Sequence, residues 1–126
     1  GISVANKSKS VTGIEIFPEA VINAEDNAKL NSIRNTTFIC EDALKLKLDK
    51  YKNIDLTIVD PPRSGLNGSV INQIKSKHLI YISCDPMTLL RDLKLLGINY
   101  KIEKVYLLDM FSYTSHIETF VKLIKK

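Results

Sequence analysis

The sequence of 126 residues has few cysteines, few arginines and no long apolar run, and each shortage excludes a class of protein. Two cysteines, Cys40 and Cys84, are too few for a disulfide framework and match no metal-ligand spacing, so we expect free thiols and no metal. No apolar run approaches the roughly 20 residues of a membrane-spanning helix. The first residues lack the basic and apolar regions of a secretory signal, so we expect a cytoplasmic protein without membrane contact.

The charge balance is modestly basic. Lys and Arg together number 18 and Asp and Glu number 14, which gives a net charge of +4. This excess fits a polyanionic partner such as RNA, and it equally fits a lysine-rich surface that only aids solubility. The arginines Arg34, Arg63 and Arg91 are spread along the chain rather than clustered. Charge alone therefore does not decide between the two interpretations.

Apolar segments and helical patterns alternate along the chain, without a linker or repeat, which predicts a single α/β domain over residues 1–126. The expected helices cover residues 2–9, 19–30, 68–77 and 87–96. The expected strands cover residues 10–16, 36–40, 54–59, 79–83, 100–108 and 116–124. The last two strands follow each other without a helix between them, so we expect a mostly parallel sheet with an antiparallel last strand.

The start of the chain does not fit a whole nucleotide-binding sheet. In such sheets the second strand ends in an acidic residue that contacts ribose hydroxyls, after a first strand and a glycine-containing loop. Glu15 has that acidic position, but only 14 residues precede it. We therefore expect the first strand to be missing and the domain to be truncated at its N-terminal end.

Polar residues follow the expected strands at the edge where open α/β sheets bind ligands. Glu15 and Asp42 are candidates for ligand contacts there. The alternative for Glu15 is a solvated carboxylate, and the alternative for Asp42 is a helix cap. Asp60-Pro61-Pro62-Arg63-Ser64-Gly65 is more specific, because two prolines turn the backbone away from the sheet and form a rigid wall beside a pocket. Gly65 permits the turn that follows.

Cys84 lies between the apolar strand at 79–83 and a helix N-terminus, whose partial positive charge favours the nucleophilic thiolate. The carboxylate of Asp85 opposes thiolate formation, unless it turns away to cap the helix. A buried, inert thiol is the alternative for Cys84, and it is the interpretation that we expect for Cys40.

Glu118 begins the final apolar strand and shares one face with His116 and Phe120. A carboxylate beside a phenylalanine is unusual in a core, so Glu118 is a candidate catalytic group. The alternative is an ordinary charge on an edge strand.

Together these motifs resemble the S-adenosylmethionine-dependent RNA uracil-5-methyltransferases, which make 5-methyluridine in ribosomal and transfer RNA. The resemblance depends on the Asp60 loop, on the Ser-Cys pair whose Cys84 follows Asp60 by 24 residues, and on the His-x-Glu motif whose Glu118 follows Cys84 by 34. It implies a Rossmann-like class I methyltransferase fold, S-adenosylmethionine as cofactor, and RNA as partner, with ribosomal RNA favoured over transfer RNA. In such a methyltransferase sheet the first strand is central, so its absence would leave an unpaired edge on the strand at 10–16 and on the strand at 54–59.

The resemblance also implies a role for each residue. Cys84 would add to carbon 6 of a uridine and so make carbon 5 nucleophilic, and Glu118 would later remove the proton from carbon 5. The family usually has asparagine after the catalytic cysteine, where this chain has Asp85. The cofactor-binding residues would be Glu15, Asp42 and Asp60. The substrate-binding residues would be Pro61, Pro62, Arg63 and His116.

Two other functions fit part of the sequence. A methyltransferase of base amino groups would grip its base with Asp60-Pro61-Pro62 and need no thiol, although Arg63 stands where that class has an aromatic residue. A non-catalytic RNA-binding module of the same fold fits Asp85 and the expected truncation. We expect the truncated chain by itself to bind the cofactor weakly and to be inactive.

Overall fold

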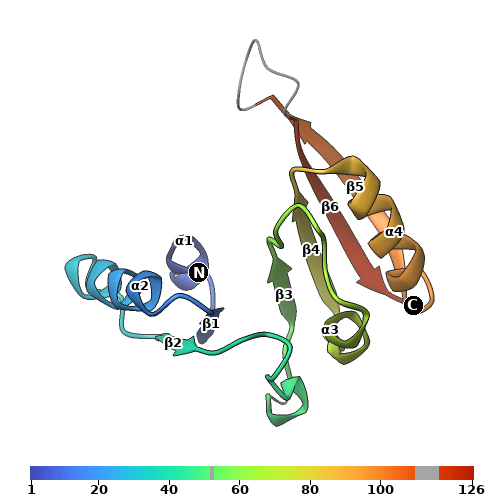
Figure 1. Ribbon diagram of the computed structural model, residues 1–126. Helices are drawn as coiled ribbons and strands as arrows, with labels where there is room; N and C mark the ends of the chain where they lie inside the picture. The colour runs from blue at the N-terminus through green and yellow to red at the C-terminus, as the bar shows by residue number, and fades with distance from the viewer. Residues whose placement is uncertain (52, 110–116) are drawn as a thin grey trace. The chain divides into compact units, whose positions relative to one another are not determined.

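The computed structural model describes residues 1–51, 53–109 and 117–126, which form two compact units, Gly1–Leu46 and Lys47–Lys126 (Figure 1). In chain order the elements are α1 (Ile2–Ala5), β1 (Val11–Glu15), α2 (Pro18–Leu30), β2 (Thr36–Cys40), the short 3₁₀ helix η1 (Leu48–Lys50), β3 (Leu56–Val59), α3 (Gly68–Gln73), β4 (His78–Ser83), α4 (Pro86–Leu96), β5 (Tyr100–Leu108) and β6 (Glu118–Lys125). None of the helices in these ranges is both long and apolar enough to cross a membrane.

The first unit is a two-stranded parallel sheet with helices α1 and α2. β1 runs beside β2 in a register that pairs Glu15 with Cys40 at the carboxyl ends. Gly13 faces Phe38 across the two strands, and a Cβ atom at Gly13 would lie 2.7 Å from the phenylalanine ring. The absence of a side chain at this position therefore lets the ring lie across β1. α2 buries Val21 and contacts β2 along its length.

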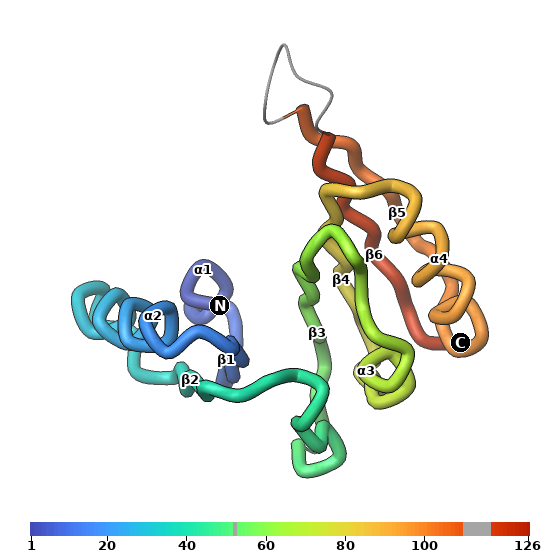
Figure 2. Tube along the Cα trace, viewed as in Figure 1, coloured from blue at the N-terminus to red at the C-terminus, as the bar shows by residue number. Residues whose placement is uncertain are grey.

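The second unit is a four-stranded sheet in the order β3-β4-β6-β5. β3 and β4 are parallel, and β6 is antiparallel to both of its neighbours. Figures 1 and 2 show α3 and α4 on the same face of this sheet, and the apolar core lies beneath them. Its buried residues are Ile71, Ile74, Leu79, Tyr81, Leu89, Leu96, Tyr100, Val121 and Leu123.

The pairing confirms three expectations about the sheet. Strands and helices alternate up to β5, the last strand is antiparallel, and β1 and β3 each keep an unpaired edge. In the part of the chain that the structure describes, β1 is bonded to β2 alone, and β3 to β4 alone. The carboxyl ends of β3 and β4 and the start of β6 consequently lie at one edge of the second sheet.

The helix expected over residues 68–77 ends at Gln73, so the prediction is wrong for its last turn. Ile74 takes an extended conformation, with φ of −71° and ψ of 116°, and its side chain is buried in the core. Ser76 is buried two residues later, where its hydroxyl donates to the His78 carbonyl oxygen. Burial of Ile74 in the core thus competes with a further helical turn. The helical spacing of apolar residues in the sequence does not reveal this burial.

Candidate active site

The polar residues predicted from the sequence lie at strand ends in both units. In the first unit, Glu15 is the last residue of β1, and Asp42 follows β2 by two residues. In the second unit, Asp60 follows β3, Cys84 follows β4, and Glu118 begins β6. Because β6 is antiparallel to β4, these last three residues share one edge of the four-stranded sheet.

Cys84 directly follows β4, and Glu118 is the first residue of β6. The ladder between β4 and β6 ends with Ser83 opposite Thr119, so Cys84 and Glu118 each lie one residue beyond its last pair. Ser83 and Thr119 are buried beneath the helices, so strand alternation places Glu118 on the opposite face of the sheet, with Phe120. Cys84 and Glu118 are both half-buried. The candidate nucleophile and the candidate base therefore lie at the same end of the β4–β6 pair.

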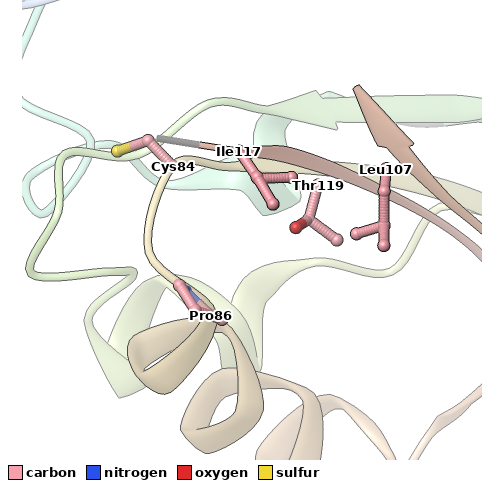
Figure 3. A pocket seen from close by; sticks show the side chains of 5 residues that line it. All are labelled: Cys84, Pro86, Leu107, Ile117 and Thr119. Atoms are coloured by element: carbon pink, nitrogen blue, oxygen red, sulfur yellow. The ribbon is translucent and has the colours of Figure 1, made fainter. Parts of the chain in front are cut away.

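A hollow of about 170 Å³ lies beside Cys84, on the side from which its sulfur points away. Its lining residues are Cys84, Pro86, Leu107, Ile117 and Thr119. In Figure 3 the sulfur of Cys84 points away from the side chains of Leu107, Ile117 and Thr119. Thr119 belongs to the helix-covered face, whereas Glu118 belongs to the opposite one. This hollow is therefore not the space in which Cys84 and Glu118 would meet a substrate.

The turn that carries Cys84 is held on both sides. The Ser83 hydroxyl donates to the Asp85 carbonyl oxygen at 2.9 Å and accepts from the Asp85 backbone N–H at 3.1 Å. Asp85 is the N-cap of α4, and its Oδ1 accepts from the backbone N–H groups of Met87 and Thr88, each at 2.9 Å. The carboxylate thus caps the helix. This is the orientation in which we expected Asp85 not to oppose a thiolate at Cys84.

The Thr88 backbone N–H bond holds the pKa of Asp85 below its ordinary value of 3.8, and the Thr88 hydroxyl, the Met87 N–H and the Arg63 charge act in the same direction. Because the folded pKa is the lower one, the charged cap contributes stability above about pH 3.8. That contribution is lost as the pH falls through the folded pKa.

The pH dependence can be isolated with Asp85→Asn, since asparagine also caps helices but carries no charge. We expect a lower melting temperature than that of the parent full-length protein at neutral pH, and a difference that closes as the pH falls below about 3.8. Calorimetric scans of both proteins across this range measure the difference. A difference that does not change with pH would show that the charge of Asp85 adds nothing to the cap.

The loop after β3 makes the tight turn that its glycine predicted. The Gly65 N–H donates to the Pro62 carbonyl oxygen at 2.8 Å, and Gly65 has a φ of +75°. Asp60 and Arg63 are exposed, whereas Pro61 is half-buried. The loop therefore offers a carboxylate and a guanidinium to solvent from a constrained backbone.

Gly65→Ala should destabilise the protein by at least about 1–3 kcal/mol, because a side chain is strained at this φ. An alanine Cβ would also lie 2.6 Å from both an Arg91 nitrogen and an Asp92 oxygen. Denaturant unfolding of the full-length protein measures the loss. Gly68→Ala is the matched control, since no atom lies within 4 Å of a Cβ there. Equal midpoints for the two variants would contradict this description of the loop.

The carboxylates of the first unit are held by the backbone that follows each strand. Glu15 Oε1 accepts from the N–H groups of Ile16 at 2.7 Å and Phe17 at 3.1 Å. Asp42 Oδ1 accepts from the Leu44 N–H at 2.9 Å. Both side chains therefore have a local role, and in each the second carboxylate oxygen makes no bond within the described residues.

Three predictions from the sequence need comment. His116 lies outside the described residues. The expectation that Cys40 belongs to the core is wrong: it is the exposed last residue of β2, at the open end of a two-stranded sheet. In the ranges that the structure describes, no group of three His, Cys, Asp or Glu side chains is arranged as a metal site.

A buried polar cluster beside the loop was not predicted from the sequence. Asp92 is fully buried in α4 and bonds to Tyr81 on β4 and to Leu66 in the loop. One signal was present in the sequence, since Asp92 falls three residues after Leu89 and four before Leu96, on the apolar stripe of the helix.

A family model described as tRNA (uracil-5-)-methyltransferase matches residues 1–126, the whole chain. The chain belongs to this family. A Clostridium tetani protein named as an uncharacterized RNA methyltransferase is 42% identical over 130 residues, which cover 100% of this chain and 28% of that protein. An Enterococcus faecalis protein of the same name is 39% identical over 132 residues, which cover 99% of this chain and 29% of that protein. The chain thus spans less than a third of the length of these methyltransferases.

Solved structures confirm the methyltransferase fold. The Pyrococcus abyssi tRNA (uracil-54, C5)-methyltransferase in complex with S-adenosyl-L-homocysteine has a TM-score of 0.88 and 32% identity, over 98% of this chain and 31% of that one. The Bradyrhizobium japonicum N-methyltransferase NodS has a TM-score of 0.78 and 15% identity, over 98% of this chain and 70% of that one. At that identity NodS shows the fold alone.

Proposed function

We propose that the full-length protein containing this chain transfers a methyl group from S-adenosylmethionine to carbon 5 of a uridine in RNA. The observation that supports the proposal is the register of β4 and β6, whose last pair, Ser83 and Thr119, directly precedes Cys84 and follows Glu118 at the sheet edge where Asp60 also lies. Membership of the uracil-5-methyltransferase family supports the same reaction. We further propose that residues 1–126 belong to one catalytic domain.

The cofactor would supply an electrophilic methyl group bound to a sulfonium sulfur. We assign its binding to Glu15, Asp42 and Asp60. In Glu15 both backbone bonds go to Oε1, which leaves Oε2 to accept from ribose hydroxyl groups. In Asp42 the backbone bond goes to Oδ1, which leaves Oδ2 to accept from an amino group. Asp60 is exposed at the end of β3.

Cys84 and Glu118 act on the base one after the other. Carbon 5 of uracil is a poor nucleophile. Addition of the Cys84 thiolate to carbon 6 turns carbon 5 into an enolate-like carbon that accepts the methyl group. Carbon 5 then carries both the methyl group and its original hydrogen. Glu118 takes that hydrogen as a proton, the carbon–sulfur bond breaks, and the double bond and the free thiolate are restored.

The remaining assigned residues would hold the RNA. Pro61 and Pro62 form the rigid wall against which a flipped base can lie, and the Arg63 guanidinium suits a phosphate or a base edge. The Arg63 charge lowers the pKa of Asp85, so its positive charge is felt at the turn of Cys84. We also assign His116, which lies outside the described residues, to contact with the RNA, from its place in the sequence alone.

The class of RNA is the finer part of the proposal. We propose ribosomal RNA, with transfer RNA as the alternative. Transfer RNA is the substrate in the name of the Pyrococcus abyssi relative. Digestion of total RNA methylated by the full-length protein, followed by mapping of 5-methyluridine, assigns the class directly.

Release of tritium from RNA that contains [5-³H]uridine tests the reaction itself. Methylation of carbon 5 must displace the hydrogen on that carbon, so we expect one tritium in water for each methyl group transferred. Methyl transfer without tritium release would indicate a base amino-group methyltransferase and overturn the proposal. RNA binding with neither event would indicate a non-catalytic module.

A further inference from the structure

Asp92 is a carboxylate on the apolar stripe of α4, at a position where an apolar residue such as leucine is expected. It lies on the core side of α4 with no exposed surface, between Leu89 and Leu96. Burying a charge is costly unless hydrogen bonds replace the lost water. Here Oδ2 accepts from the Tyr81 hydroxyl at 2.5 Å and from the Leu66 backbone N–H at 2.7 Å. Oδ1 accepts from the guanidinium of Arg91, whose Nε is 2.9 Å away.

Arg91 extends this cluster to the loop that follows β3. One guanidinium nitrogen donates to the carbonyl oxygens of Ser64 at 2.8 Å and Leu66 at 3.2 Å. One turn earlier on the helix, the Thr88 hydroxyl donates to the Arg63 carbonyl oxygen at 2.9 Å. Three side chains on one face of α4 therefore hold the backbone of residues 63–66.

Tyr81 joins the same carboxylate to the strand that leads to Cys84. Its side chain is fully buried, and burial, followed by the bond to Asp92, raises the pKa of Tyr81. The hydroxyl therefore stays protonated and keeps donating to Asp92 at any pH at which the protein works. Tyr81 lies three residues before Cys84 on β4. Strand, helix and loop consequently meet at one carboxylate.

We propose that Asp92, Arg91 and Thr88 are positioning residues that fix the Asp60-to-Gly65 loop relative to Cys84. This inference rests on the proposed function. The loop carries the candidate cofactor and base contacts, and α4 begins two residues after the nucleophile. A loop that moves relative to Cys84 would slow attack on carbon 6 without changing the thiol itself. Misplacement of reacting groups by about 1 Å can cost about 100-fold in rate.

Arg91 is the residue to change first, because its side chain is 53% exposed whereas that of Asp92 is fully buried. In the full-length protein, Arg91→Ala should lower kcat for tritium release by about 10- to 100-fold. Added guanidinium ion, well below denaturing concentration, should restore part of this loss, since it can occupy the exposed gap. Alkylation of Cys84 by iodoacetamide should stay within about 2-fold of the parent, because the thiol and its turn are untouched.

Lys94→Ala is the matched control, since Lys94 is an exposed cation in the same helix and touches none of these groups. It should keep the parent kcat and show no guanidinium effect. A second readout is amide hydrogen exchange of Gly65 and Leu66, which should speed up in Arg91→Ala alone.

Two results would overturn the inference. One is an active parent with an equally active Arg91→Ala variant. The other is a lower kcat that guanidinium does not restore, with a fallen melting temperature, which would show that Arg91 only stabilises the fold. A parent protein that releases no tritium would instead overturn the proposed function. Unchanged amide exchange of Gly65 and Leu66 in Arg91→Ala would then also show that Arg91 does not fix the loop.

Discussion

Cys84→Ala should reduce methyl transfer by the full-length protein by at least about 1,000-fold, because no other group described at this sheet edge can add to carbon 6. Without that addition, carbon 5 stays too weak a nucleophile to take the methyl group. Affinity for RNA should stay within about 2-fold, since the variant removes one half-buried sulfur atom. Tritium release from [5-³H]uridine RNA measures the first effect, and filter binding measures the second.

Cys40→Ala is the control that separates a catalytic thiol from a thiol in general. Cys40 is exposed at the end of β2, and its sulfur contacts the Ile16 carbonyl oxygen at 3.7 Å. The control should keep the parent rate. If Cys84→Ala retained more than about a tenth of that rate, the covalent mechanism would be wrong, whatever the family of the chain.

Glu118→Gln should slow tritium release by about 100- to 10,000-fold, the usual effect of removing a general base. The predicted signature is more specific than a slow rate. The thiolate can still add and the methyl group can still transfer, but the proton on carbon 5 cannot leave. A covalent complex of protein and methylated RNA should therefore accumulate, visible as a denaturant-resistant band that carries labelled methyl groups.

Glu103→Gln is the matched control for this variant. Glu103 is a carboxylate on the neighbouring strand β5, where it forms a 2.9 Å ion pair with Lys122 away from Cys84. Its loss should leave the rate unchanged and give no trapped band. Parent-like turnover in Glu118→Gln would show that another group is the base.

The elements that the sequence predicted best are those that local chemistry determines. The strands at Thr36–Cys40 and Tyr100–Leu108 have the predicted bounds, and Asp85 caps α4 as its position before Pro86 indicated. The errors arise where the outcome depends on distant contacts. α3 stops early because Ile74 packs into the core, and Cys40 is exposed because its strand ends at the rim of a small sheet.

The candidate site divides in the same way. The sequence could identify Cys84 and Glu118 as candidates, and the structure puts each of them one residue beyond the Ser83–Thr119 pair that ends the β4–β6 ladder. The bonds that join α4 to the loop after β3 could not be predicted in detail, because a bond such as that from Leu66 N–H to Asp92 joins residues 26 positions apart. Only the place of Asp92 on an apolar helix stripe indicated that something unusual was buried there.

The most direct test of the central claim uses RNA that contains 5-fluorouridine, together with S-adenosylmethionine and the full-length protein. Fluorine on carbon 5 cannot leave as a proton, so Glu118 has nothing to remove and the methylated adduct should persist. Mass spectrometry of the digested complex should find one methylated fluorouridine attached to the peptide that contains Cys84. An adduct on the peptide of Cys40, or fully methylated RNA with no protein attached, would contradict the account.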